Sequence, residues 1–131
     1  WRQHVEQLIR RELYDPSTDV LLLDGIPRSK PQAEAMQDHI DPFMVIHLVC
    51  ENLDEMAGRM KKRATEQGRP DDANESVIRK RFEVFEEQTA PVLACYDESI
   101  VENIDALGTP VEVFQRVLNA VVPAVAASKT S

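Results

Sequence analysis

The sequence VLLLDGIPRSKPQAE, residues 20–34, decides the fold that we predict for this chain. It opens with four apolar residues, 20–23, which predict a buried strand of a parallel sheet that ends at Asp24. Open α/β sheets bind their ligands at the carboxyl ends of such strands, and the glycine and proline that follow predict a tight turn there. Arg28 comes just after the turn, where its guanidinium group could bind an anion through two hydrogen bonds.

The rest of the chain alternates helical and strand patterns. Apolar residues at helical spacing predict helices over residues 2–13, 31–39, 52–66, 74–97 and 110–122. Apolar runs predict two further strands, over residues 43–49 and 100–104. Pro91 is expected to kink the fourth helix or to restart it after a cap at Thr89. Alternating strands and helices predict an α/β fold, with a parallel sheet and helical crossovers.

Composition and charge argue against several classes of protein. A length of 131 residues suits one domain, and the net charge of −8 argues against a nucleic-acid partner. No uninterrupted apolar run reaches the roughly 18 residues of a membrane helix, so no membrane partner is predicted. The two cysteines lie far apart and are expected to be reduced thiols, which favours a cytoplasmic location. Residues 124–131 are small and polar and are expected to form a flexible tail.

Basic residues are concentrated in one segment of this acidic chain. Residues 59–81 contain eight basic and four acidic residues, an excess of +4, so the rest of the chain carries −12. The segment is either a solvated helix surface or the binding site of a local anionic ligand. Arg59 and Arg63 are four residues apart on one predicted helix, so they share a face. If the two flanking helices form a hairpin, Arg69 and Arg81 would join them around a phosphate.

Three parts of the sequence resemble the adenylate kinases, a family of nucleoside monophosphate kinases, in the order in which that family carries them. The first, LLLDGIPRSKPQAEAM (21–36), resembles a signature in which a strand ends in Asp-Gly before Pro-Arg and a helix with glutamine. The second, RMKKRATEQGRPDDANESVIRKRF (59–82) with QTAPVLACY (88–96), resembles the family's lid and the helix after it. The third, IVENIDALGTPVEVF (100–114), resembles the last strand and helix.

This resemblance implies one partial adenylate kinase domain over residues 1–131, with a three-layer parallel sheet of the P-loop NTPase kind and helices on both faces. Residues 64–74 would form a short lid, without room for the zinc site of some long-lid members. The implied activity is phosphoryl transfer between ATP and AMP to give two molecules of ADP, with Mg²⁺ bound alongside ATP.

The resemblance also implies a role for each matching residue. The AMP site would contain Gly25, Ile26, Pro27, Arg28, Gln32, Arg69 and Arg81, with Gln32 contacting the adenine. The ATP site would contain Arg59, Arg63 and Gly108. The catalytic arginines would be Arg63, Arg69 and Arg81, and the residues that orient the lid would be Asp71 and Asp72. Asp24, which is otherwise a simple turn former, would hold a water molecule on Mg²⁺.

The main departure from the family is the missing phosphate-binding loop. The motif G-x-x-x-x-G-K-[ST] does not occur in this sequence, and the family carries it in a segment that would precede Trp1. Smaller departures are Ile26 in place of an aromatic residue, Ser29 in place of threonine, and one extra residue near Ala73. We therefore expect this isolated chain to be inactive. The alternative function is that of a non-catalytic adenylate kinase-like module for nucleotide binding or assembly.

The absent loop also affects the predicted sheet. In the family its strand is central, between the strands that match residues 20–24 and 43–49. Those two strands could pair directly, a partner chain could supply a strand, or a preceding segment could supply it within a longer protein. We expect the last arrangement, which predicts a sheet truncated at its N-terminal part.

Overall fold

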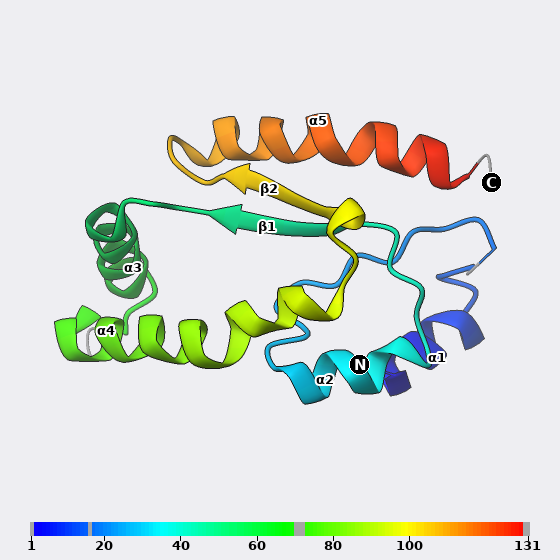
Figure 1. Ribbon diagram of the computed structural model, residues 1–131, viewed down its shortest axis with the longest axis horizontal. Helices are drawn as coiled ribbons and strands as arrows, with labels where there is room; N and C mark the ends of the chain where they lie inside the picture. Colours follow the sequence, from blue (N-terminus) through cyan, green and yellow to red (C-terminus); the bar gives the residue numbers. More distant parts are fainter. Residues whose placement is uncertain (1, 16, 70–72, 130–131) are drawn as a thin grey trace.

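The computed structural model describes residues 2–15, 17–69 and 73–129, and Figure 1 shows their arrangement. Five α-helices lie in these residues: α1 (Arg2–Arg10), α2 (Lys30–Gln37), α3 (Leu53–Glu66), α4 (Glu75–Val84) and α5 (Pro110–Ser128). The two strands are β1 (Val45–Val49) and β2 (Val101–Asp105). A π-helical turn and two 3₁₀ turns connect α4 to β2: η2 (Phe85–Thr89), η3 (Ala90–Cys95) and η4 (Glu98–Ile100).

The strands β1 and β2 form a parallel pair, in register from Val45 with Val101 to Val49 with Asp105. In Figure 1, α5 lies along one side of this pair, and α2, α4 and η3 lie on the other side. Helix α5 packs on β2, and α2 packs on η3. This mixture of helices and parallel strands confirms the predicted α/β class. The sheet among the described residues has two strands and is not the full three-layer sheet that we predicted.

Residues 20–23 differ most from the prediction, because they have no regular secondary structure. Their side chains alternate in exposure: Val20 is 40% and Leu22 is 80% exposed, whereas Leu21 and Leu23 are half-buried. The sheet of the described residues pairs β1 with β2, so this segment forms no strand ladder with either of them. The prediction of a buried strand here is therefore wrong.

Local signals located the helices more accurately. Helix α3 begins after Asn52, whose Oδ1 accepts a hydrogen bond of 3.1 Å from the Glu55 N–H, as the predicted cap requires. The predicted helix over residues 74–97 ends its regular α-helical part at Val84 and continues as η2 and η3. Pro91 lies in the first turn of η3, which fits a restart of the helix at a residue that lacks an N–H group.

Helix α5 extends beyond its predicted end near residue 122 and continues through Pro123 to Ser128. The predicted flexible tail, residues 124–131, thus begins inside this helix. By length and composition alone, α5 could also cross a membrane, although it contains no uninterrupted apolar run of about 18 residues. A single helix of this kind is weak evidence for a membrane partner.

The buried core is small for a chain of this length. Among the described residues, the buried apolar side chains are Ala33, Met36, Ala64, Ile78, Val92 and Ile104. The accessible surface is 9952 Å², whereas about 7,000 Å² is typical of a folded monomer of this mass. Large apolar side chains of α5 remain exposed, including Val111 at 76% and Val122 at 62%. Each of these few buried side chains is therefore expected to contribute a large share of the hydrophobic stabilisation of the fold.

Candidate functional site

The turn that follows Asp24 is closed by the side chain of Arg28. Gly25 adopts φ +72°, a conformation that favours glycine, and the Ile26–Pro27 peptide bond is cis. Arg28 Nε donates a hydrogen bond of 2.7 Å to the Gly25 carbonyl oxygen. A Cβ atom at position 25 would lie 3.0 Å from Arg28 Nη2, so the guanidinium group packs closely on the turn. The Arg28 side chain itself remains exposed to solvent and is accessible to an anion.

The backbone of Arg28 is held on both sides. Its N–H group donates a 2.8 Å hydrogen bond to Gln32 Oε1, in the first turn of α2. Its carbonyl oxygen accepts a 3.2 Å hydrogen bond from Thr89 Oγ1, at the end of η2. The structure therefore brings together Arg28 and Gln32, two of the residues predicted for the AMP site. Thr89 makes no cap hydrogen bond, and its contact with Arg28 had no signal in the sequence because the two residues are 61 positions apart.

Asp24 lies immediately before this turn and is exposed. Within the described residues, no group of three or more His, Cys, Asp or Glu side chains could form a metal site. Magnesium, however, usually keeps several waters and takes one or two carboxylates together with substrate phosphates. A single accessible carboxylate close to an exposed guanidinium group is compatible with that kind of coordination.

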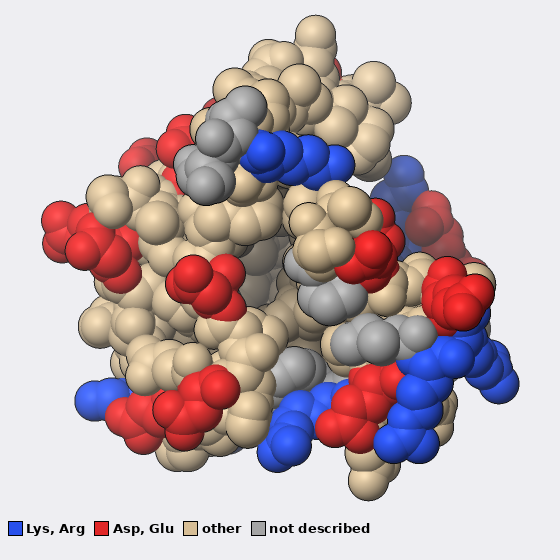
Figure 2. Space-filling model, turned by 90° about the vertical axis from the view of Figure 1, so that its right-hand side faces the viewer, with Lys and Arg blue, Asp and Glu red and all other residues tan. Residues whose placement is uncertain are grey.

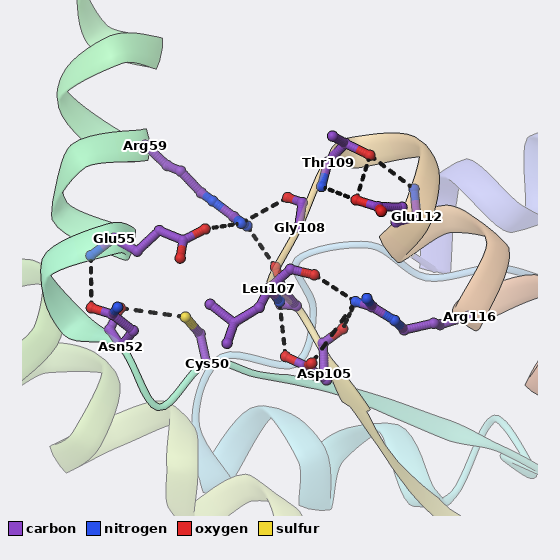
Figure 3. Close-up of polar contacts among 11 residues, drawn as sticks. Cys50, Asn52, Glu55, Arg59, Asp105, Leu107, Gly108, Thr109, Glu112 and Arg116 are labelled. Carbon is purple, nitrogen blue, oxygen red and sulfur yellow. Dashed lines mark hydrogen bonds and ion pairs between the residues drawn. The ribbon is translucent and has the colours of Figure 1, made fainter.

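A second cluster of contacts surrounds the loop after β2, shown in Figure 3. Arg59, from α3, donates from Nη1 to the Ala106 carbonyl oxygen at 2.6 Å and from Nη2 to the Gly108 carbonyl oxygen at 2.8 Å. Its Nη2 also lies 2.5 Å from Glu55 Oε1, one helical turn earlier. The structure thus brings together Arg59 and Gly108, two of the residues predicted for one nucleotide site.

Arg116, from α5, approaches the same loop and was not predicted. Its Nη1 donates to the carbonyl oxygens of Asp105 at 2.8 Å and Leu107 at 2.5 Å. Two arginines from different helices thus bind four consecutive carbonyl groups in alternation. A weak signal was present in the sequence: Arg116 lies at helical spacing among apolar residues such as Val113, on the half-buried side of α5.

The start of α5 fixes the end of this loop through a capping box. Glu112 Oε2 accepts 2.7 Å and 2.8 Å hydrogen bonds from the backbone and hydroxyl of Thr109, whose Oγ1 accepts a 3.3 Å bond from the Glu112 N–H. Gly108 adopts φ +101°, and a Cβ atom there would lie 2.7 Å from Glu112 Oε2. The backbone conformation therefore favours glycine, and a side chain here would have to displace the Glu112 carboxylate.

The capping box predicts that part of the chain's stability depends on pH. Hydrogen bonds from the Thr109 backbone and side chain hold the pKa of the Glu112 carboxyl below its usual range. A depressed pKa in the folded state gives stability that is present above the unfolded-state pKa and is lost as the pH falls through the folded-state value. We expect Glu112→Gln to reduce the loss of stability on acidification, measured by urea unfolding between about pH 7 and pH 3. Glu51→Gln, which removes an exposed glutamate outside the box, should follow the wild type; identical curves for all three proteins would contradict the prediction.

The predicted lid arginines lie around α3 and α4, which are in contact. Arg63 is exposed on α3, and Arg81 lies in the last turn of α4. Arg69 follows α3; its N–H donates 2.8 Å to the Ala64 carbonyl oxygen, and its Nη2 donates to Gln67 Oε1. Asp71 and Asp72 lie outside the described residues. Convergence of the four arginines on one phosphate remains a prediction.

Charge on the opposite end of the molecule is mixed. Figure 2 views the end farthest from α3 and α4, where acidic side chains are spread over the face and basic ones are interspersed among them. No continuous basic surface lies on this face within the described residues, which is in line with the net charge of −8.

Comparison with known proteins relates this chain to a family. The chain is 41% identical over 104 residues to an adenylate kinase of Kocuria rhizophila, which covers 76% of this chain and 55% of that protein. It is 35% identical over 116 residues to an adenylate kinase of Thermus thermophilus, with 85% and 60% covered. It is 40% identical over 97 residues to adenylate kinase isoenzyme 1 of Gallus gallus, with 73% and 50% covered. No protein-family model matches the chain.

These matches define the class of protein first: the chain is related to the nucleoside monophosphate kinases. Within that class, it belongs to the adenylate kinase family. The chain spans about half to three fifths of the length of the curated relatives that it matches.

Proposed function

We propose that this chain carries the nucleotide-binding residues of an adenylate kinase, which transfers a phosphoryl group between ATP and AMP to give two molecules of ADP. The observation that carries the proposal is the turn at residues 24–28. There the exposed Arg28 side chain and the Gln32 carboxamide are held next to each other by the 2.8 Å hydrogen bond from the Arg28 N–H to Gln32 Oε1. A cation for a phosphate and an amide for a base edge are the two groups that a nucleoside monophosphate needs.

In this proposal the turn is the AMP site. Arg28 binds the phosphate, because its Nε is occupied by the Gly25 carbonyl oxygen while its other N–H donors remain for an anion. Gln32 uses its oxygen to hold the Arg28 backbone, so its NH₂ group can donate to the adenine. Ile26 and Pro27 border the same site. Because Oε1 has a second lone pair, the Gln32 amide could both donate to and accept from the adenine edge, and this pairing favours AMP over uridylate and cytidylate.

The ATP site lies at the loop after β2. Three of the five in-plane N–H donors of Arg59 are bound to Glu55, Ala106 and Gly108. The faces of its planar guanidinium group are left for stacking on a base. Gly108 has no side chain, so the base can approach its backbone closely. Arg63, one turn further along α3, would bind the ATP phosphates.

Arginines of the lid would act during phosphoryl transfer. Such reactions depend mainly on positioning and on stabilisation of the charge that develops on the transferred group. Arg63, Arg69 and Arg81 would supply that positive charge, and Asp71 and Asp72 would orient the lid. Asp24 would hold a water molecule of Mg²⁺, an ion that, when bound, neutralises phosphate charge.

A second function is supported by one feature of the sequence. The chain contains no G-x-x-x-x-G-K-[ST] motif, which in P-loop enzymes supplies the backbone cradle and the lysine for ATP phosphates. Taken by itself, the chain would then bind nucleotides without catalysing the transfer, as a module for binding or assembly. Both proposals include AMP binding at the turn of residues 24–28. They differ in whether the chain catalyses formation of ADP.

One experiment tests the AMP site and separates the two proposals. We expect the purified chain to bind AMP more tightly than UMP or CMP by isothermal titration calorimetry, and to form no ADP from ATP, AMP and Mg²⁺ in a phosphorus NMR assay. Clear ADP formation would contradict inactivity of the isolated chain and exclude the non-catalytic function. Equal affinities for the three monophosphates, or no binding of any, would contradict the proposed AMP site.

A further inference from the structure

The loop from Asp105 to Gly108 is held by hydrogen bonds to each of its four carbonyl groups. Those of Asp105 and Leu107 accept from Arg116, and those of Ala106 and Gly108 accept from Arg59. The Ala106 N–H donates 2.8 Å to the Val49 carbonyl oxygen, and the Leu107 N–H donates 2.9 Å to Asp105 Oδ1. Figure 3 shows the two guanidinium groups approaching the loop from opposite sides.

This arrangement makes the position of Arg59 depend on that of Arg116. Arg59 binds the loop only through two carbonyl groups that alternate along the chain with the two bound by Arg116. A change that releases the Arg116 contacts frees every second peptide group and lets the loop rotate. The carbonyl oxygens that hold the plane of Arg59 would then move with it.

We propose that Arg116 is a positioning residue for the base of ATP: it fixes the loop so that Gly108 and the Arg59 guanidinium group are correctly placed. This inference rests on the proposed ATP site. In this proposal Arg116 acts on the loop and not on the nucleotide: its Nη1 binds two loop carbonyl oxygens and lies 4.0 Å from Asp105 Oδ2. Its effect passes through the backbone of the loop.

The chemistry of arginine suits this role. One Nη group of a guanidinium has two N–H donors, and Nη1 of Arg116 uses them for two carbonyl oxygens that are two residues apart. A lysine ammonium group could replace the charge but has a flexible stem and no planar fork. A glutamine side chain has no charge and is shorter than that of arginine. The two substitutions therefore give a graded series.

The test measures ATP binding with AMP present in saturating amounts, so that ATP reports on its own site. We expect Arg116→Gln to weaken ATP binding about tenfold, a loss typical of residues that affect a binding site without touching the ligand. The affinity for AMP should remain unchanged. Arg116→Lys should give a smaller loss. As a matched control, Arg79→Gln removes an arginine whose recorded ion pair, 3.8 Å to Glu75, lies on the exposed surface of α4, and it should bind both nucleotides as the wild type does.

Each outcome decides the proposal. Unchanged ATP affinity in Arg116→Gln, or equal losses for ATP and AMP, would overturn the positioning role and leave the proposed function intact. Absence of ATP binding by the wild-type chain would overturn the proposed ATP site and this inference together. If Arg116→Gln does not fold, Arg116→Lys still tests the role. Faster amide hydrogen exchange at Leu107 and Gly108 in that variant would support it, and unchanged exchange with unchanged ATP affinity would overturn it.

Discussion

Replacing Ile104 with alanine is expected to lower the free energy of unfolding by about 2–5 kcal/mol. Ile104 is 4% exposed and lies on β2, where it pairs in register with Leu48 of β1. The substitution removes a buried branched side chain and leaves a cavity against the strand pair. The total stability of a typical domain is about 5–15 kcal/mol, so this loss is a large fraction of it. Few other buried residues of this core could compensate. Urea unfolding followed by circular dichroism measures it.

Leu22→Ala provides the matched control for this measurement. Leu22 is 80% exposed, so its truncation should change the free energy of unfolding by no more than about 0.5 kcal/mol. A loss in Leu22→Ala as large as that in Ile104→Ala would show that residues 20–23 are packed as a buried strand. That result would restore the prediction from the sequence and contradict the structure.

Replacing Arg28 with alanine is expected to weaken AMP binding by about 10- to 100-fold, which corresponds to the loss of one or two hydrogen bonds to a charged group. The substitution removes the guanidinium group that closes the turn at 2.7 Å from the Gly25 carbonyl oxygen and that we propose for the AMP phosphate. Arg28→Lys should give an intermediate loss, because an ammonium group keeps the charge but cannot bind the phosphate through a planar fork. Isothermal titration calorimetry measures both variants.

A nearby lysine gives the control for charge alone. Lys30 lies two residues further on, with 64% of its side chain exposed and its Nζ 3.9 Å from Glu34 Oε1. Lys30→Ala changes the net charge as Arg28→Ala does and should keep the wild-type affinity for AMP. If Arg28→Ala also keeps that affinity, Arg28 has no role in phosphate binding.

The features that the sequence predicted correctly depend on neighbouring residues. Asn52 begins α3 because its side chain caps an amide three residues on, and the apolar runs around Val45 and Val101 become β1 and β2. Arg28 and Gln32 lie close together because one turn and the first residues of one helix join them, although the sequence predicted a shared site and not this hydrogen bond. Each of these signals lies within a few residues of the feature that it predicts.

The features that the sequence did not predict depend on distant residues. The apolar pattern of residues 20–23 identifies a segment suited to a sheet, but pairing requires a neighbouring strand, and among the described residues β1 pairs with β2. Thr89 reaches Arg28 across 61 positions, so its spacing carries no information. The sequence showed Arg116 only as a charged residue at helical spacing among apolar residues. Its hydrogen-bond partners depend on how the loop after β2 folds.

The parallel pairing of β1 with β2 has a consequence for the order of folding. All of α3 and α4, with the turns after them, separates the two strands, so the pair must close a long loop before it gains any contact. The backbone hydrogen bonds within helices α3 and α4 are local, so these helices can form earlier. We therefore expect the contacts of Arg59 with Gly108 to form late in folding, after the strands have paired. The same contacts should be among the first lost in partial unfolding, so nucleotide binding would fail while most of the helical structure persists.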